Sequence, residues 1–233
     1  MERPIIGITI SVNFSSLLEL TMPINLHHFA KWYIITDQKD KNTTTLCHHF
    51  DPEVVECQYF DFQENGKLLN KGGALRLGQI TAHLDHPDAW YLILDADILL
   101  PDNLKEFLTS LDYARDTLYG VEARYDFASI SEVKSNNYQE YIHGDKFTGF
   151  FQLYGDANKY YTSSYSLDKC DDLFRETFSV KKYISGLHVH HLGKSGIGVR
   201  YLREDGKEWN AKLDEQTFLR NAKFDPEELS FTS

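Results

Sequence analysis

Hydrophobic residues in the amino-terminal part of the chain fall into short apolar runs separated by amphipathic stretches. Apolar runs rich in β-branched and aromatic residues are typical of buried strands. They predict strands at residues 5–11, 31–36, 54–62 and 90–94. The intervening stretches predict helices at residues 15–29, interrupted near Pro23, and at 44–49 and 71–84. This alternation favours a parallel sheet covered by helices.

Beyond Pro101 the hydrophobic pattern is less regular. It predicts helices at residues 102–111 and 168–178, and strands at 117–123, 148–154 and 186–192. Residues 129–146 are polar, with interleaved charges and tyrosines, and we expect a loop or a flexible helix there. No repeat or Pro-rich linker divides the chain, so we expect a single α/β domain, residues 1–233, with a mixed sheet flanked by helices.

The clearest chemical signal is Asp95-Ala96-Asp97, which ends the apolar strand predicted at residues 90–94. Ligands of open α/β sheets collect at the carboxyl ends of strands. Two acids beside a hydrophobic core are unfavourable unless a cation or hydrogen bonds compensate them. A hard divalent ion such as Mg²⁺ or Mn²⁺ prefers oxygen ligands of this kind. The alternative is a turn in which the aspartates cap the helix after Pro101.

Charge and cysteine content exclude several classes of protein. The net charge is -11, from 24 Lys and Arg against 35 Asp and Glu, whereas proteins that bind nucleic-acid backbones need clustered cations. Three cysteines without C-x-x-C spacing support neither a disulfide framework nor a zinc ribbon. Asn13 interrupts the first apolar run, and no stretch approaches the roughly 20 apolar residues of a membrane span. We therefore expect a soluble cytoplasmic protein without a nucleic-acid partner.

The order of these segments resembles a known family. Lys71-Gly72-Gly73 opens a helix that leads to the strand ending in Asp95-Ala96-Asp97, with Pro101 shortly after. This arrangement resembles the nucleotide-sugar half of GT-A-fold glycosyltransferases, especially those like family 2. The resemblance covers residues 5–101 well and continues loosely to 198. It implies a GT-A-type Rossmann-like fold, with a nucleotide-sugar half at about 1–101 and an acceptor half at about 102–233.

The same resemblance implies roles for individual residues in the first half. Asp97 is expected to bind Mn²⁺ or Mg²⁺, and Asp95 to lie between the ribose and that metal. The resemblance also implies nucleotide contacts for four further residues. Thr9 is expected to contact the base and Asp37 the nucleoside, and Lys71 and Arg76 are expected to contact the phosphates. The alternatives are an ordinary strand residue for Thr9, a turn residue for Asp37 and a solvated helix face for Lys71 and Arg76.

In the second half, Cys170-Asp171-Asp172 resembles the acidic motif that supplies the catalytic base of inverting members. An acceptor hydroxyl must lose its proton as it attacks, and a carboxylate can accept that proton. Adjacent helical residues point about 100° apart, so we expect only one acid to face the site, with Asp172 preferred over Asp171. The alternative is that both acids stabilise the start of the helix.

A cluster of histidines follows, at His188, His190 and His191. Zinc would usually need thiolate or carboxylate ligands from elsewhere in the chain. The His-Leu-Gly sequence instead resembles the late strand that gives GT-A enzymes a histidine for the metal or diphosphate, and His191 is the matching position. In an extended segment His188 and His190 share the face opposite His191. Lys194 is expected to close over the diphosphate, and a structural histidine is the alternative for His191.

Together these features predict a metal-dependent glycosyltransferase. It would move a sugar from a nucleotide-sugar donor, with UDP expected, to a hydroxyl of a carbohydrate or glycoconjugate acceptor, with inversion. A haloacid-dehalogenase-like phosphohydrolase is one alternative, but its Asp-x-Asp motif normally follows the first strand. A sugar nucleotidyltransferase should carry a Gly-rich, Arg-containing loop after that strand, which residues 11–16 do not resemble. A non-catalytic module that binds a metal with a nucleotide or carbohydrate is the third alternative.

Overall fold

The strands of the protein form one mixed sheet flanked by helices. The computed structural model describes residues 3–62, 70–111, 114, 116–127, 139–141, 147, 149–162 and 167–192. Within these ranges nine strands form one sheet in the order β3-β2-β1-β4-β8-β6-β9-β5, and β7 pairs with β6. Lys194, the tail from residue 204 and most of the polar segment at 129–146 lie outside the described residues.

The first half of the sheet is parallel, as the alternating pattern predicts. Its strands pair in the order β3-β2-β1-β4, and they are β1 (Ile5–Ile10), β2 (Lys31–Thr36), β3 (Val55–Tyr59) and β4 (Trp90–Leu94). The helices between them are α1 (Ser15–Asn25), α2 (Lys41–Cys47) and α3 (Lys71–Asp85). Helices cover both faces, so β4 is buried along its whole length and appears in the sequence as an unbroken apolar run.

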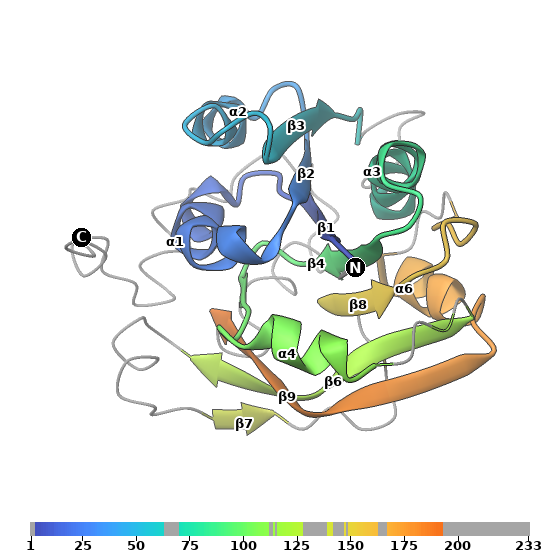
Figure 1. Cartoon of the computed structure of the whole chain (residues 1–233). Helices are drawn as coiled ribbons and strands as arrows, with labels where there is room; N and C mark the ends of the chain where they lie inside the picture. The colour runs from blue at the N-terminus through green and yellow to red at the C-terminus, as the bar shows by residue number, and fades with distance from the viewer. Residues whose placement is uncertain are drawn as a thin grey trace.

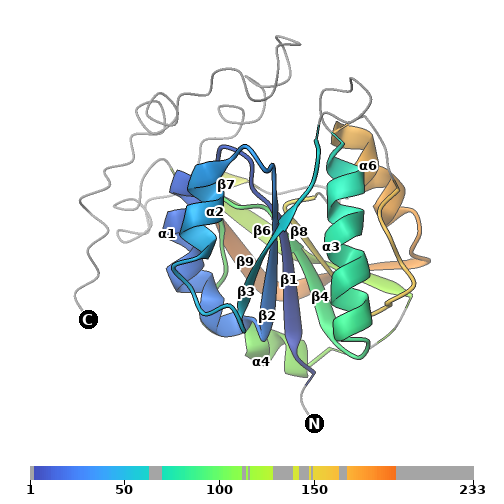
Figure 2. The same cartoon turned by 90° about the horizontal axis from the view of Figure 1, so that it is seen from above.

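The two faces of the sheet carry different helices (Figure 2). Helices α1 and α2 lie on one face, and α3 lies on the other beside α6 (Leu167–Arg175). The chain steps from β1 to β2 to β3 in one direction and then returns past β1 to β4. Because such crossovers are right-handed, the return places α3 on the opposite face. The order of strands therefore reverses between β1 and β4, where α/β proteins bind ligands.

The second half of the sheet is mixed and curls back toward β4. Strand β8 (Phe151–Tyr154) runs antiparallel between β4 and β6 (Thr117–Phe127), and β9 (Val180–Leu192) pairs parallel with β6 (Figure 1). The other elements here are β5 (Ile98–Leu99), α4 (Leu104–Thr109) and β7 (Gln139–Tyr141). Strand β5 pairs antiparallel with β9, yet only residues 95–97 separate it from β4. The Asp-Ala-Asp segment therefore occupies the junction where the sheet curls back.

The predicted strands and helices are confirmed, with several shifted ends, but residues 139–141 form strand β7 within the segment expected to be a loop or a flexible helix. A 3₁₀ turn, η1 (Leu26–His28), follows α1, and α2 begins before residue 44 because the Asp40 carboxylate accepts a hydrogen bond from Thr43 N at 3.0 Å. Strand β9 begins before residue 186, where its side chains are mostly exposed and give no apolar signal. Among the described residues no helix has both the length and the apolar character needed to cross a membrane.

Two histidines lie in the interior of the fold. His28 is 1% exposed and His83 is 5% exposed. Burial lowers the pKa of each imidazole from 6.5 to about 4. An unfolded chain takes up these protons as the pH falls through 6.5, whereas the folded protein resists protonation until about pH 4. The stability contributed by the neutral rings is therefore present above pH 6.5 and is lost as the pH falls toward 4.

We expect the free energy of unfolding to fall by about 3 kcal/mol per histidine between pH 6.5 and pH 4. Urea denaturation at a series of pH values measures this slope. In His83→Gln the slope should be shallower by the contribution of one histidine, whereas His49→Gln, at an exposed position, should keep the wild-type slope. Identical slopes for His83→Gln and the wild type would show that His83 does not contribute.

Candidate functional site

Charged side chains from distant parts of the sequence meet at the carboxyl edge of the parallel strands. Asp95 and Asp97 follow β4, and Lys71 is the first residue of α3. Asp171 lies on α6, and His191 lies near the end of β9. The sequence-predicted residues of both halves are thus brought into one site.

The pairing of β5 with β9 places His191 beside Asp97. Ile98 is the register partner of His191, and Leu192 N donates to Asp97 O at 2.8 Å. The His191 ring then lies between two carboxylates, with Nε2 3.1 Å from Asp97 Oδ2 and Nδ1 3.0 Å from Asp126 Oδ1. The predicted proximity of Asp97 and His191 therefore follows from backbone pairing.

Charges around His191 keep the imidazole protonated. Burial would lower the pKa of His191, but the Asp97 charge and the hydrogen bonds to Asp126 and Asp97 outweigh it and raise the pKa to about 9. Burial would likewise raise the pKa of Asp126, but the contacts with His191 and Arg124 hold it below its ordinary value. At neutral pH, His191 donates from both ring nitrogens.

Lys71 interacts electrostatically with the carboxylates of Asp95 and Asp171, and Asp95 also interacts with Asp97 and Asp171. Burial raises the pKa of Asp95 to about 6, opposed by Lys71 and reinforced by Asp97 and Asp171. Burial would lower the pKa of Lys71, but Asp171 and Asp95 outweigh it and hold that pKa above its ordinary value. Such crowding of acids destabilises their charged forms and is relieved by a cation.

Asp171 faces this cluster, whereas Asp172 points to solvent. The Lys71 Nζ atom lies 3.0 Å from Asp171 Oδ2, and the side chain of Asp172 is 57% exposed and pairs with Arg175 at 3.0 Å. A Cβ atom at Gly149 would lie 2.2 Å from Asp171 Oδ2, so only glycine lets the carboxylate lie against this backbone. The geometry reverses the predicted preference for Asp172, because α6 turns Asp171 toward Lys71.

Tyr161 connects Asp171 to the interior. Its hydroxyl lies 3.0 Å from Asp171 Oδ1 and makes a second, short contact with the Gln152 amide. One hydroxyl proton cannot be donated to two acceptors. We therefore assign the Gln152 amide so that its nitrogen donates to Tyr161, whose proton then goes to Asp171. This chain, together with Lys71, fixes the orientation of the Asp171 carboxylate.

Thr9 and Asp37 lie in different surroundings from the acidic cluster. Thr9 is fully buried, and its hydroxyl accepts a hydrogen bond from Trp32 Nε1 at 2.9 Å. This matches the alternative role of Thr9 as an ordinary strand residue, and base contact by Thr9 stays a prediction. Asp37 Oδ1 accepts from Lys39 N at 2.8 Å, which matches its alternative role as a turn residue, and nucleoside contact by Asp37 stays a prediction.

Arg76 contacts two tyrosines. The exposed Arg76 guanidinium lies over the Tyr160 ring, 5.5 Å from its centroid, and donates to Tyr161 O at 3.5 Å. Its contact with a phosphate stays a prediction. Lys194 lies outside the described residues.

His188 points away from the metal-site candidates. Its Nδ1 atom lies 2.8 Å from the Tyr125 hydroxyl, whereas His191 contacts Asp97 and Asp126. The predicted separation of these histidines onto opposite faces of the strand is confirmed.

Asp126 is the site residue that we did not predict. It lies in β6 opposite His191 in the parallel register, and its side chain is bound by Arg124 through Nε–Oδ1 at 2.8 Å. Polar residues at 122, 124 and 126 alternate with less polar ones. This period of two could have extended the predicted strand beyond residue 123.

The donor set fits a divalent ion that arrives with a substrate. Among the described residues no group of three or more His, Cys, Asp or Glu is arranged to hold a metal ion by itself. Asp97 Oδ1, however, is buried and has no hydrogen-bond partner within the described part of the chain. Mg²⁺-type ions commonly use one or two protein ligands and complete their shell with water and substrate phosphates. Asp97 Oδ1 and His191 Nε2 suit that role.

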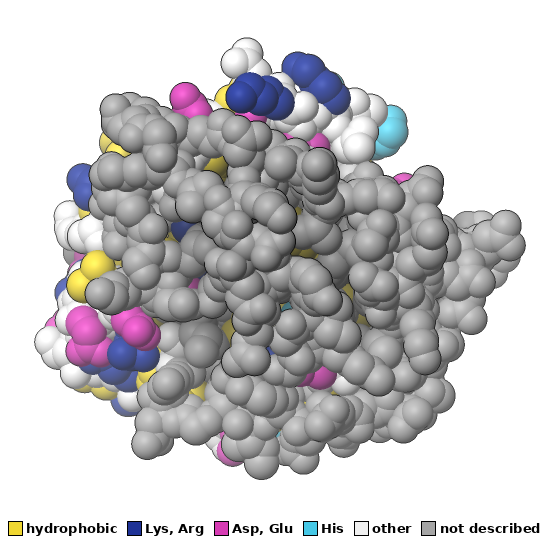
Figure 3. Space-filling view, turned by 180° about the vertical axis from the view of Figure 1, so that it is seen from behind, with side chains coloured by type: hydrophobic (Ala, Val, Ile, Leu, Met, Phe, Trp, Pro, Cys, Tyr) yellow, Lys and Arg dark blue, Asp and Glu magenta, His cyan; other side chains and the backbone are white. Residues whose placement is uncertain are grey.

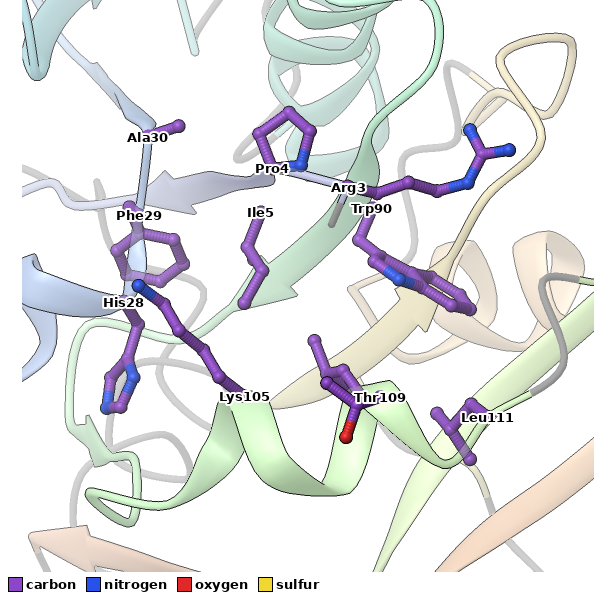
Figure 4. A pocket seen from close by; sticks show the side chains of 11 residues that line it. Arg3, Pro4, Ile5, His28, Phe29, Ala30, Trp90, Lys105, Thr109 and Leu111 are labelled. Atoms are coloured by element: carbon purple, nitrogen blue, oxygen red, sulfur yellow. The ribbon is translucent and has the colours of Figure 1, made fainter. Parts of the chain in front are cut away.

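A cavity of about 580 Å³ lies at the opposite edge of the sheet. Figure 4 shows Ile5 and Trp90, at the amino ends of their strands, facing Lys105 and Thr109 of α4. Lys105 Nζ already donates to His27 O at 3.2 Å, and the acidic cluster does not line this cavity. The chemistry-bearing residues and the cavity are therefore separate.

The surface seen from behind carries mixed charge. Among the described side chains visible there, Lys and Arg lie beside Asp and Glu along the margin (Figure 3). The absence of a nucleic-acid partner stays a prediction.

Comparisons with known proteins give a likeness of fold at low identity. No protein-family model matches the chain, and no curated protein matches it. Among solved structures, 4-diphosphocytidyl-2C-methyl-D-erythritol synthase is 14% identical with a TM-score of 0.49, covering 78% of this chain and 89% of its own. The inositol-1-phosphate CTP transferase from T. maritima is 7% identical with a TM-score of 0.47, covering 80% and 88%.

A third solved structure is a glycosyltransferase. Mouse xyloside xylosyltransferase 1 is 9% identical with a TM-score of 0.37, covering 76% of this chain and 71% of its own. Two of the three proteins are transferases by name, but these TM-scores and identities assign no activity to this chain. The function is therefore inferred from the site itself.

The ion pair between Lys71 and Asp171 can be tested by a double-mutant cycle. We expect Lys71→Met to lower the free energy of unfolding by about 2 kcal/mol, because it leaves the carboxylates of Asp95 and Asp171 without their cation. Adding Asp171→Asn should restore part of the loss, and urea denaturation measures both steps. Lys39→Met, at an exposed lysine, is the control. Strictly additive losses would exclude an energetic coupling between the two side chains.

Proposed function

We propose that this chain is a divalent-metal-dependent glycosyltransferase that uses a nucleotide-sugar donor, with a UDP-sugar as the expected donor. The observation that carries the proposal is the pair formed by Asp97 and His191 at the carboxyl edge of the sheet. Asp97 offers a buried oxygen without a partner, and His191 is held beside it by strand pairing. Asp95 and Lys71 lie within electrostatic reach of the same place.

Donor binding in this proposal uses three side chains of different charge. Asp97 Oδ1 and His191 Nε2 would hold Mn²⁺ or Mg²⁺, whose remaining ligands would come from the diphosphate and water. His191 would give up its Nε2 proton and keep the Nδ1 proton that faces Asp126. Lys71 would bring a positive charge toward the phosphates from the start of α3, at the edge where α/β folds bind nucleotides.

Sugar transfer requires a stabilised leaving group and a proton acceptor. A bound divalent ion supplies Lewis-acid stabilisation of the departing nucleoside diphosphate. Asp171 would accept the proton of the attacking acceptor hydroxyl as the bond to the anomeric carbon forms. Tyr161 and Lys71 hold that carboxylate in place, so its orientation does not depend on the acceptor. Attack from the face opposite the leaving group would invert the anomeric configuration.

The first test measures release of nucleoside diphosphate from a panel of UDP-, GDP-, ADP- and dTDP-sugars, with Mn²⁺ or with EDTA. We expect release from one nucleotide class only in the presence of the metal. Asp97→Asn should reduce the rate by roughly 100-fold or more, because the amide is a poor ligand for a hard ion. Asp102→Asn changes an exposed acid nearby and should leave the rate unchanged.

Other results of the same assay would assign a different function. Release of pyrophosphate from a nucleoside triphosphate and a sugar phosphate would indicate nucleotidyl transfer. Release of phosphate from simple phosphomonoesters would indicate a hydrolase. Metal-dependent binding without turnover of any donor would indicate a non-catalytic module.

The adjacent acids on α6 provide a matched pair for the catalytic base. We expect Asp171→Asn to lower kcat by roughly 10²–10⁴-fold with little change in donor KM, since general-base catalysis contributes about that much. Asp172→Asn should change kcat by less than about twofold, because the Asp172 side chain faces solvent. Steady-state kinetics measures both variants, and a loss confined to Asp172→Asn would restore the preference given by sequence.

A further inference from the structure

A chain of four charged side chains runs through the second half of the sheet. Arg124 bonds Asp126, Asp126 bonds His191, and His191 bonds Asp97. These three contacts measure 2.8 Å, 3.0 Å and 3.1 Å in that order. The proposed reaction gives Asp126 no part.

We propose that Asp126 is a positioning residue that fixes the His191 ring so that Nε2 faces the divalent ion beside Asp97. This inference rests on the proposed function, since it concerns the ion that binds with the nucleotide. A histidine that binds a metal through Nε2 must carry its hydrogen on Nδ1. A carboxylate that accepts from Nδ1–H selects that tautomer and that ring orientation, and it strengthens the metal bond.

The backbone makes this contact part of the sheet. Asp126 and His191 are register partners in the parallel pair of β6 and β9, so their side chains leave the sheet on the same face. The register shifts between Val121 and Ala123, and Gly186 adopts a φ of 75° on the opposing strand. This irregularity sets the pairing that follows, and the pairing brings Asp126 Oδ1 within 3.0 Å of His191 Nδ1.

Asp126 is itself held in one orientation. Arg124 lies two residues earlier on β6 and contacts both carboxylate oxygens, at 2.8 Å from Nε and 3.3 Å from NH2. The Arg124 guanidinium also lies over the Phe150 ring, 5.0 Å from its centroid. A buried carboxylate paired in this way retains its charge and presents a fixed acceptor to the imidazole.

The exposed fraction of the side chain increases from Asp126 through His191 to Asp97. The Asp126 side chain is 5% exposed, that of His191 is 14% exposed and that of Asp97 is 17% exposed. The carboxylate that orients the ring is therefore buried, and the His191 and Asp97 side chains are only partly exposed, with Asp97 Oδ1 itself buried. His188 does not share this arrangement, because its Nδ1 contacts the Tyr125 hydroxyl on the other face of the strand.

The test measures binding of Mn²⁺ in the presence of UDP, by isothermal titration and by the electron-spin resonance signal of free Mn²⁺. We expect Asp126→Leu to weaken Mn²⁺ binding by roughly 10–100-fold, the usual effect of removing an outer partner of a metal-bound histidine. Asp126→Asn keeps an oxygen that accepts from Nδ1–H and should retain most of the affinity. Glu122→Gln changes an exposed acid on the same strand and should bind like the wild type.

A second readout follows the tautomer directly. In the Mg²⁺- and UDP-bound protein, ¹⁵N correlation spectra should show the His191 proton on Nδ1 in the wild type and in Asp126→Asn. In Asp126→Leu a substantial fraction of His191 should instead carry its proton on Nε2 and so be detached from the ion, because a ring bound to Mg²⁺ through Nε2 has no proton there. A purely structural role for Asp126 would lower stability in both variants without changing the tautomer. If Asp126→Leu does not fold, Asp126→Ser serves instead, because its hydroxyl is too short to reach Nδ1.

The outcomes separate this inference from the proposed function. If the wild type binds no Mn²⁺ with UDP, the proposed metal-dependent function fails. If the wild type binds Mn²⁺ and the folded Leu or Ser variant binds it equally, with the Nδ1–H tautomer retained, the positioning role of Asp126 is overturned while the proposed function stands. Weaker binding with a changed tautomer, rescued by Asn, supports the inference.

Discussion

The pairing of β5 with β9 is the constraint on which the site depends. Strand β5 is short, Ile98–Leu99, yet it joins the end of the chain's first half to the last strand of the sheet. Through it the sheet curls back to β4, and residues 95–97 span the junction. Without that pairing Asp97 would not be held beside His191, whose own position is also fixed by the pairing of β9 with β6.

Charge and burial act together at this junction. Burial makes isolated carboxylates unfavourable, and the protein compensates each with a partner: Lys71 for Asp171, His191 for Asp97 and Arg124 for Asp126. The compensation is incomplete, since Asp95 keeps a raised pKa and Asp97 keeps an oxygen without a partner in the described part of the chain. In the proposed function, this residual imbalance is what a bound cation would relieve.

Sequence reasoning recovered the first half of the fold because both faces of those strands are covered. Burial on both sides produces unbroken apolar runs, as in β4 (Trp90–Leu94), whose ends were predicted correctly. It missed β5, which is too short to show a period, and the exposed start of β9. It also missed β7, a three-residue strand within a polar segment. The choice between Asp171 and Asp172 depended on the rotation of one helix, which composition does not reveal. Asp126 was missed because its partner lies far along the chain.

One consequence concerns the independence of the two halves. The parallel strands form the layer that binds nucleotides in folds of this type, yet a fragment ending at Pro101 would carry Asp95 and Asp97 without Asp171 or His191. The two halves are therefore not separable modules that evolution could exchange freely. An insertion or deletion in β9 would shift its register against β6 and β5 at once, and every contact of His191 would change with it.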